Sequence, residues 1–191
     1  MVFMLLVCIA ELSAIPLKAA YRANPIPANS NAWVFNVLLF FQISAFAIMF
    51  YKLIGKYGNS KLLVFGGTGV LFLLYVYETF SHARGIFDYN ATTYTVMSVL
   101  FVLYSLYYYF LLITSEEYAD LKFLPEFWWV TGTLFFFFGT TAINMFRSIL
   151  VVQPLKNTLY LGYIDTTLIV ILYGCWTYAF ICKKWITLAR K

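Results

Sequence analysis

Charge is scarce in this sequence. Asp, Glu, Lys and Arg make up 11% of its 191 residues, while hydrophobic residues make up 63%. A soluble domain typically has about 25% charged and about 45–50% apolar residues. The scarcity of charge therefore excludes an ordinary soluble core, and the mean hydropathy of +0.81 indicates a membrane protein.

Histidine and paired cysteines are also lacking. The chain has one His and three Cys, namely Cys8, Cys175 and Cys182, and no C-x-x-C pair. Each Cys lies in an apolar run, where a thiol commonly behaves as a small hydrophobic side chain. We therefore expect no Cys/His metal site and no cofactor.

Catalytic motifs are absent from the sequence as well. It contains neither H-E-x-x-H nor G-x-S-x-G, and its single His excludes mechanisms that need two. Every Lys lies at or beyond the end of an apolar run, so no Lys is placed to bind retinal in the middle of a span. These absences predict a protein without enzymatic activity.

What the sequence does contain is six long apolar runs. A helix rises ~1.5 Å per residue, so ~20 mostly apolar residues cross the ~30 Å hydrocarbon core of a bilayer. The runs lack the alternation that marks barrel strands. The predicted fold class is therefore all-α, a polytopic transmembrane helical bundle that forms a single integral membrane domain over residues 1–191. The predicted spans cover residues 2–15, 33–54, 62–80, 93–113, 127–146 and 160–182.

The first run is shorter than the others. Glu11 interrupts it and Pro16 closes it, which predicts a short span. Met1 opens directly on apolar residues, without the basic region of a signal peptide. The alternative is that the chain as given starts late, and that a preceding helix would make seven spans in a longer native chain.

Small residues cluster in two of the runs. Gly66, Gly67 and Gly69 lie in the third, and Gly132 and Gly139 share one face of the fifth. A phosphate-binding interpretation of the first cluster fails, because no strand precedes it. Small residues in membrane helices commonly allow close helix contact, so we expect both clusters to lie at helix–helix contacts.

The polar connection over residues 81–92 carries two local signals. Gly85 is expected to break the preceding helix. Asn90-Ala91-Thr92 fits an N-glycosylation acceptor, a three-residue pattern that often arises by chance.

The net charge of +5 comes from Lys and Arg in the gaps between the runs, so it bears on topology rather than on nucleic-acid binding. With six spans and the C-terminus inside, eight basic residues fall on the inner side and five on the outer side. This bias predicts a cytoplasmic C-terminus, in a bacterial inner membrane.

The segment PEFWWVTGTLFFFFG, at residues 125–139, joins a Pro-x-Phe-Trp entry to an aromatic run that closes on Gly. With Phe50-Tyr51-Lys52-Leu53 and the aromatic run over residues 94–112, it resembles an uncharacterised family of small multi-span membrane proteins of Bacteroidota. The resemblance covers residues 10–185 and implies seven helices, the first run here matching the family's second. Gln42 and Met97-Ser98 stand where that family usually has Glu, and no biochemistry carries over.

Polar side chains inside the runs gather near the predicted outer ends. An ionisable group costs about 2.5–3.5 kcal/mol at a helix centre in hydrocarbon, so it needs a partner or water. The predicted site is an outward vestibule for a ligand or ion, comprising Glu11, Asn36, Glu78, His82, Asn144, Arg147 and Asp165. The structural alternative is an Arg147–Asp165 pair between antiparallel helices, with Glu78 snorkelling to the interface.

The function that these features predict is sensing or signalling, through a ligand in the vestibule or a partner in the membrane. Besides the lipid bilayer, the partner would be another membrane protein or a second copy of the chain, and not nucleic acid. One alternative is a transporter or oligomeric channel that uses Asp165 and Glu11 for a proton or cation path. Another is an accessory subunit of a larger membrane complex.

Overall fold

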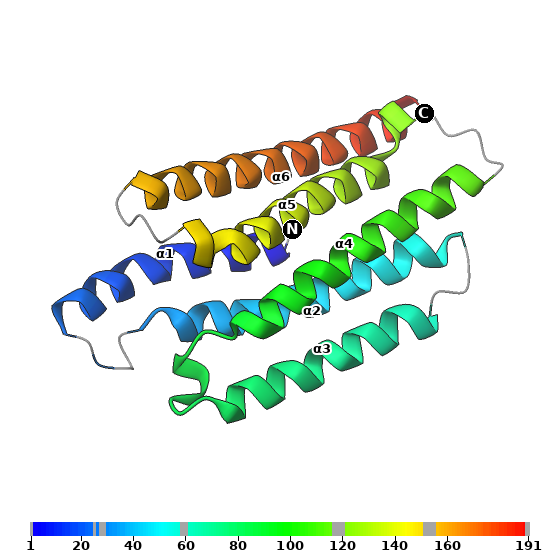
Figure 1. Cartoon of the computed structure of the whole chain (residues 1–191). Coiled ribbons are helices and arrows are strands. Elements are labelled where there is room, and N and C mark those ends of the chain that lie inside the picture. The colour runs from blue at the N-terminus through cyan, green and yellow to red at the C-terminus, as the bar shows by residue number, and fades with distance from the viewer. Residues whose placement is uncertain are drawn as a thin grey trace. The chain divides into compact units, whose positions relative to one another are not determined.

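The computed structural model describes residues 2–24, 26, 30–57, 61–115, 121–150 and 156–189. All the regular secondary structure in these residues is helical. Side chains are described over 3–24, 26, 30–57, 62–115, 121–145 and 162–182. The elements, drawn in Figure 1, are α1 (Val2–Ala23), α2 (Ala32–Gly55), α3 (Lys61–Ser81), η2 (Gly85–Phe87), α4 (Ala91–Thr114), η3 (Leu121–Phe123), α5 (Pro125–Leu150) and α6 (Lys156–Ala189).

Five of the helices are long and apolar enough to cross a membrane, by length and composition. They are the stretches Phe3–Ala23, Ala32–Gly55, Leu62–Ser81, Ala91–Thr114 and Gly162–Cys182. The chain is therefore an integral membrane protein, and the predicted all-α class is confirmed for the described residues. Helix α5 is not among the five, so the count of six spans stays a prediction.

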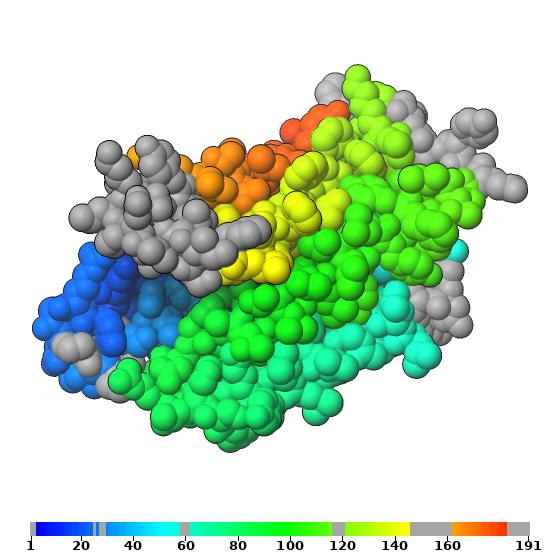
Figure 2. Space-filling model, in the orientation of Figure 1, coloured from blue at the N-terminus to red at the C-terminus, as the bar shows by residue number. Residues whose placement is uncertain are grey.

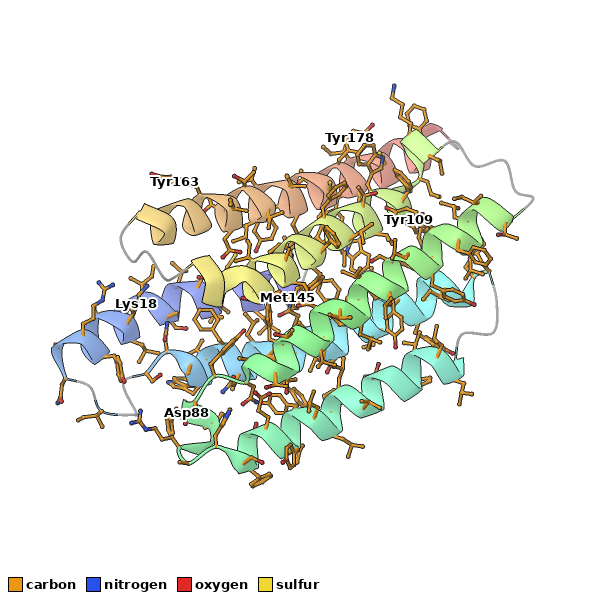
Figure 3. All side chains as sticks on the ribbon, viewed as in Figure 1. Lys18, Asp88, Tyr109, Met145, Tyr163 and Tyr178 are labelled. Atoms are coloured by element: carbon orange, nitrogen blue, oxygen red, sulfur yellow. The ribbon has the colours of Figure 1, made fainter. Side chains whose placement is uncertain are left out.

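The first helix does not end at Pro16. α1 continues through this residue to Ala23, so the expectation that Pro16 closes the first helix is wrong. Proline lacks the N–H that a helix interior uses, but membrane helices tolerate it better than soluble ones do. Lys18 and Arg22, which the sequence placed in a connection, lie in the last turns of the helix, and Figure 3 shows Lys18 there.

Contacts divide the chain into two compact units, which are described separately. The first comprises Met1–Gly55 and Asn59–Met97, and the second comprises Lys56–Gly58 and Ser98–Lys191. Helix α4 begins in the first unit and continues in the second.

In the first unit, α2 contacts both α1 and α3. The buried face of α2 is built on Leu39, Ile43, Phe46 and Phe50, at most 2% exposed and spaced three to four residues apart. This spacing aligns them along one side of a helix. Phe3 of α1 contacts Phe46 edge-on, with ring centroids 5.7 Å apart.

In the second unit, α5 and α6 pack against each other in antiparallel directions (Figure 1). A Cβ added to Gly132 would lie 2.8 Å from the Cβ of Cys175, and one added to Gly139 would lie 2.5 Å from Cδ1 of Leu168. The expectation that these two glycines mark a close helix contact is confirmed. Next to Gly132, the rings of Trp129 and Trp176 stack with centroids 5.7 Å apart.

The glycines of α3 have the opposite surroundings. A Cβ added to Gly66 or Gly69 would meet nothing within 4 Å in the described chain. Both lie on an exposed face with Phe65 and Leu73, and Figure 2 shows the surface of α3 along one edge of its unit. The expected helix contact is therefore absent at Gly66 and Gly69 among the described residues.

Candidate functional site

The side chain of Asn36 ties the turn between α3 and α4 to α2. Its amide nitrogen donates to the carbonyls of Ile86 and Asp88 at 2.8 and 2.7 Å, and its amide oxygen accepts from the backbone N–H of Asn90 at 3.1 Å. Asn36 is fully buried, and both ends of its amide are engaged. Its role is therefore to supply the hydrogen bonds that this turn cannot make for itself. Figure 3 labels Asp88 in the turn.

The carboxylate of Glu78 caps the start of α4. One oxygen accepts from the N–H of Thr92 at 2.9 Å, and the other accepts from the N–H and the hydroxyl of Thr93 at 2.7 and 2.6 Å. The first N–H groups of a helix have no partner within it, and a negative charge there interacts favourably with the helix dipole. Glu78 is buried and engaged in this way, so the expectation that it snorkels to the interface is wrong.

Asn90 closes the same arrangement from the other side. Its side-chain nitrogen donates to the hydroxyl of Thr79 at 2.8 Å, and the hydroxyl of Tyr75 donates to the carbonyl of Asn36 at 3.3 Å. Asn90 is fully buried, and a glycan would have to attach to the nitrogen that Thr79 engages. The folded protein therefore does not present Asn90 as a glycosylation acceptor.

Gly85 and His82 shape the turn that these side chains hold. Gly85 has a φ of +55°, in the left-handed region that favours glycine, and its N–H donates to the carbonyl of His82 at 3.0 Å. The backbone N–H of His82 donates in turn to the carbonyl of Glu78 at 3.2 Å, which extends α3 by one bond. His82 is thus part of the turn, as the predicted helix break at Gly85 requires.

The structure therefore brings two of the seven predicted vestibule residues together. They bind backbone groups of the protein and do not line an open cavity. Asn36 and Glu78 serve one polar clamp, which we define as Asn36, Tyr75, Glu78, Thr79, Asn90, Thr92 and Thr93. Sequence reasoning did not find the other clamp residues. The available signal was Asn90 immediately before an apolar run, since Asn is a preferred residue at a helix start.

Glu11 occupies a different place from the one predicted. It is the tenth of the 22 residues of α1, about 14 Å from the first residue and about 18 Å from the last. Because the helix continues past Pro16, Glu11 lies near its middle and not near an end. Its side chain is exposed, beside Ile9 and Leu12, which are 62% and 69% exposed.

The remaining predicted residues lie on α5 and α6. Asn144 is half-buried, Asp165 is exposed, and the side chain of Arg147 lies outside the described residues. The contacts of Gly132 with Cys175 and of Gly139 with Leu168 fix the antiparallel register, which sets Asp165 level with Ala142. Arg147 is five residues further along α5, about 7–8 Å along the axis. The Arg147–Asp165 pair stays a prediction, and it requires the long arginine side chain to reach back along α5.

Among the described residues, no group of three or more His, Cys, Asp or Glu side chains could hold a metal ion. The polar clamp contains one carboxylate and two side-chain amides. Their described hydrogen bonds are mostly to backbone groups, which is typical of a role in holding the fold rather than of a site that binds and releases a ligand. Among the predicted site residues with described side chains, the exposed acids are Glu11 and Asp165.

Comparisons with known protein families, with curated proteins and with solved structures find no match to this chain.

Proposed function

We propose that this chain is a non-enzymatic membrane protein that senses or signals by binding a partner within the bilayer. The observation that carries the proposal is the exposed carboxylate of Glu11 near the middle of α1. An ionisable side chain at that depth is costly in lipid and is a default pointer to function. The polar clamp supports the same choice, since its Asn36 and Glu78 serve the fold rather than an open vestibule.

The finer parts of the proposal come from the sequence. They are six spans, a bacterial inner membrane, a cytoplasmic C-terminus and membership of the uncharacterised Bacteroidota family that the aromatic segment over residues 125–139 resembles. The proposal keeps a smaller outward vestibule, formed by Asn144 on α5 and Asp165 on α6.

The test is photo-crosslinking in native membranes, with a photoreactive amino acid at exposed positions of three helices. Suitable positions are Leu5 on α1, Leu73 on α3 and Val170 on α6, which are 62%, 73% and 64% exposed. A specific protein adduct at one position, and none at the others, supports partner binding. Adducts with lipid alone at all three positions would contradict it.

A transporter or channel is the second candidate, because Glu11 and Asp165 both lie within candidate spans. Here purified protein in liposomes should conduct protons or cations, and Glu11→Gln and Asp165→Asn should each abolish the flux. Partner binding without flux favours the first proposal, whereas flux lost in both variants favours the second.

A further inference from the structure

One side of α1 is exposed and takes no part in the polar clamp or in the contact of α1 with α2. Ala10 and Ala14 are the buried side chains of this helix, and α1 contacts α2. Leu5, Ile9, Leu12 and Ile15 are each more than 60% exposed, with Cys8 and Glu11 also exposed among them. The result is an apolar surface with one carboxylate at its border, near the middle of the helix length, which we call the Glu11 face.

The backbone next to Glu11 offers a second acceptor. Pro16 has no N–H, so it cannot donate the hydrogen bond that the carbonyl of Leu12 would receive in an uninterrupted helix. Leu12 and Pro16 are both exposed. A partner at this face would therefore meet two groups that accept hydrogen bonds, one of which carries a negative charge when ionised.

Among the described residues, no Lys or Arg lies level with Glu11 on α1. Each described Lys or Arg lies in a connection or within about two turns of a helix end, as Lys18 does on α1. A second copy, inserted in the same direction, would bring another Glu11 to this depth rather than a base. Charge complementarity therefore points away from self-association.

We infer that the Glu11 face docks a transmembrane helix of another membrane protein, and that this helix carries a Lys or Arg at mid-depth. The inference rests on the proposed partner-binding function and names the chemistry of the partner. Apolar side chains of the partner would cover Leu5, Ile9 and Ile15, while its basic group would donate to Glu11 and to the carbonyl of Leu12.

The probe is a pair of synthetic transmembrane peptides, Leu-rich and identical except for Lys or Leu at the central position. With the full-length protein in phosphatidylcholine liposomes, energy transfer from its tryptophans to a dansyl group on the peptide reports association. We expect the Lys peptide to bind about tenfold more tightly than the Leu peptide. Glu11→Gln should remove that preference, and Glu126→Gln, a change in the first turn of α5, should keep it.

Cys8 locates the contact. It is exposed and lies three residues before Glu11 on the same side of the helix, so a Lys peptide with Cys three residues to either side of its Lys should form a disulfide with it under mild oxidation. Cys8→Ser should abolish that product.

Three outcomes of these experiments would overturn the inference. They are a preference for Lys that survives in Glu11→Gln, no preference at all, and a Glu11-dependent dimer of the protein without peptide. A native partner cross-linked only through α3 or α6 would overturn it too, while leaving the proposed function intact.

Discussion

The carboxylate of Glu78 accepts hydrogen bonds from a helix to which it does not belong. In Glu78→Ala, the N–H groups of Thr92 and Thr93 lose these partners, and a buried group such as the Thr93 N–H left without one costs about 1–3 kcal/mol. We expect a clear fall in the unfolding temperature in mild detergent, and a smaller fall for Glu78→Gln, which keeps an accepting oxygen.

The matched control for this variant is Glu126→Ala, because Glu126 is a partly exposed acid in the first turn of α5. It should lose only the modest contribution of an acid at a helix start, about 0.3–1 kcal/mol. Equal unfolding temperatures for Glu78→Ala and Glu126→Ala would show that the cap does not stabilise the fold.

Asp165 is the second residue whose role can be measured. Since it is exposed, its loss should cost less than that of a buried ion pair, and polar contacts between membrane helices average about 0.6 kcal/mol with a maximum of about 1.7. Asp165→Ala should destabilise the protein by an amount in this range. If Arg147 is the partner, Arg147→Ala added to Asp165→Ala should cost little more, and unfolding temperatures of all four proteins give the double-mutant cycle. Strictly additive losses would show that the two side chains do not interact.

The hydrogen-bond partners of individual residues are the part of the site that is hardest to predict from the sequence. The sequence predicts Asn36 and Glu78 as lining residues of an outward vestibule, whereas the structure engages them with the turn before α4 and with the start of α4. Their actual partners are backbone groups up to 54 positions away, such as the N–H of Asn90, and no local pattern encodes that distance. Glu11 lies further from the helix end than the sequence predicts, because α1 continues through Pro16.

At the scale of elements, glycines with the same sequence pattern have different surroundings. Gly132→Ala should destabilise α5 against α6 most, because the new Cβ would lie 2.8 Å from the Cβ of Cys175 and 3.2 Å from the carbonyl oxygen of Leu172, and backbone cannot move easily. Gly139→Ala should cost less, since its Cβ would meet the flexible end of Leu168. Gly69→Ala meets open space and should be neutral or stabilising, as Ala favours helix by up to about 1 kcal/mol.

Unfolding temperatures in one detergent would rank these three variants, with Gly132→Ala lowest. A Gly69→Ala protein that unfolds as early as Gly132→Ala would mean that α3 has a tight neighbour.

The existence and type of the helices were predictable from the sequence, because long apolar runs leave a membrane chain few alternatives to helix. Which small residues contact a neighbour was not, because a stripe of glycines has the same pattern whether or not another helix approaches it.

At the scale of the whole molecule, topology is the property that the basic residues predict. With Lys183, Lys184, Arg190 and Lys191 after the last apolar stretch, the C-terminus should be retained in the cytoplasm. Alkaline phosphatase fused after Lys191 should be inactive, and a green fluorescent protein at the same position should fluoresce. An active phosphatase would reverse the assignment of every connection.

The length of α6 has a mechanical consequence for that end of the molecule. Its 34 residues give a rod about 51 Å long, which exceeds the ~30 Å hydrocarbon core by about 20 Å. A tilt of about 20°, the average for membrane helices, shortens the projection by only about 3 Å. Part of the rod must therefore stand in the headgroup layer or beyond it, before Gly162 and after Cys182, and basic residues follow Cys182. Anionic lipids attract such a segment by about 1 kcal/mol for each basic residue near the surface. The lipid composition of the leaflet on that side would then affect how firmly this end of the rod is held at the membrane surface.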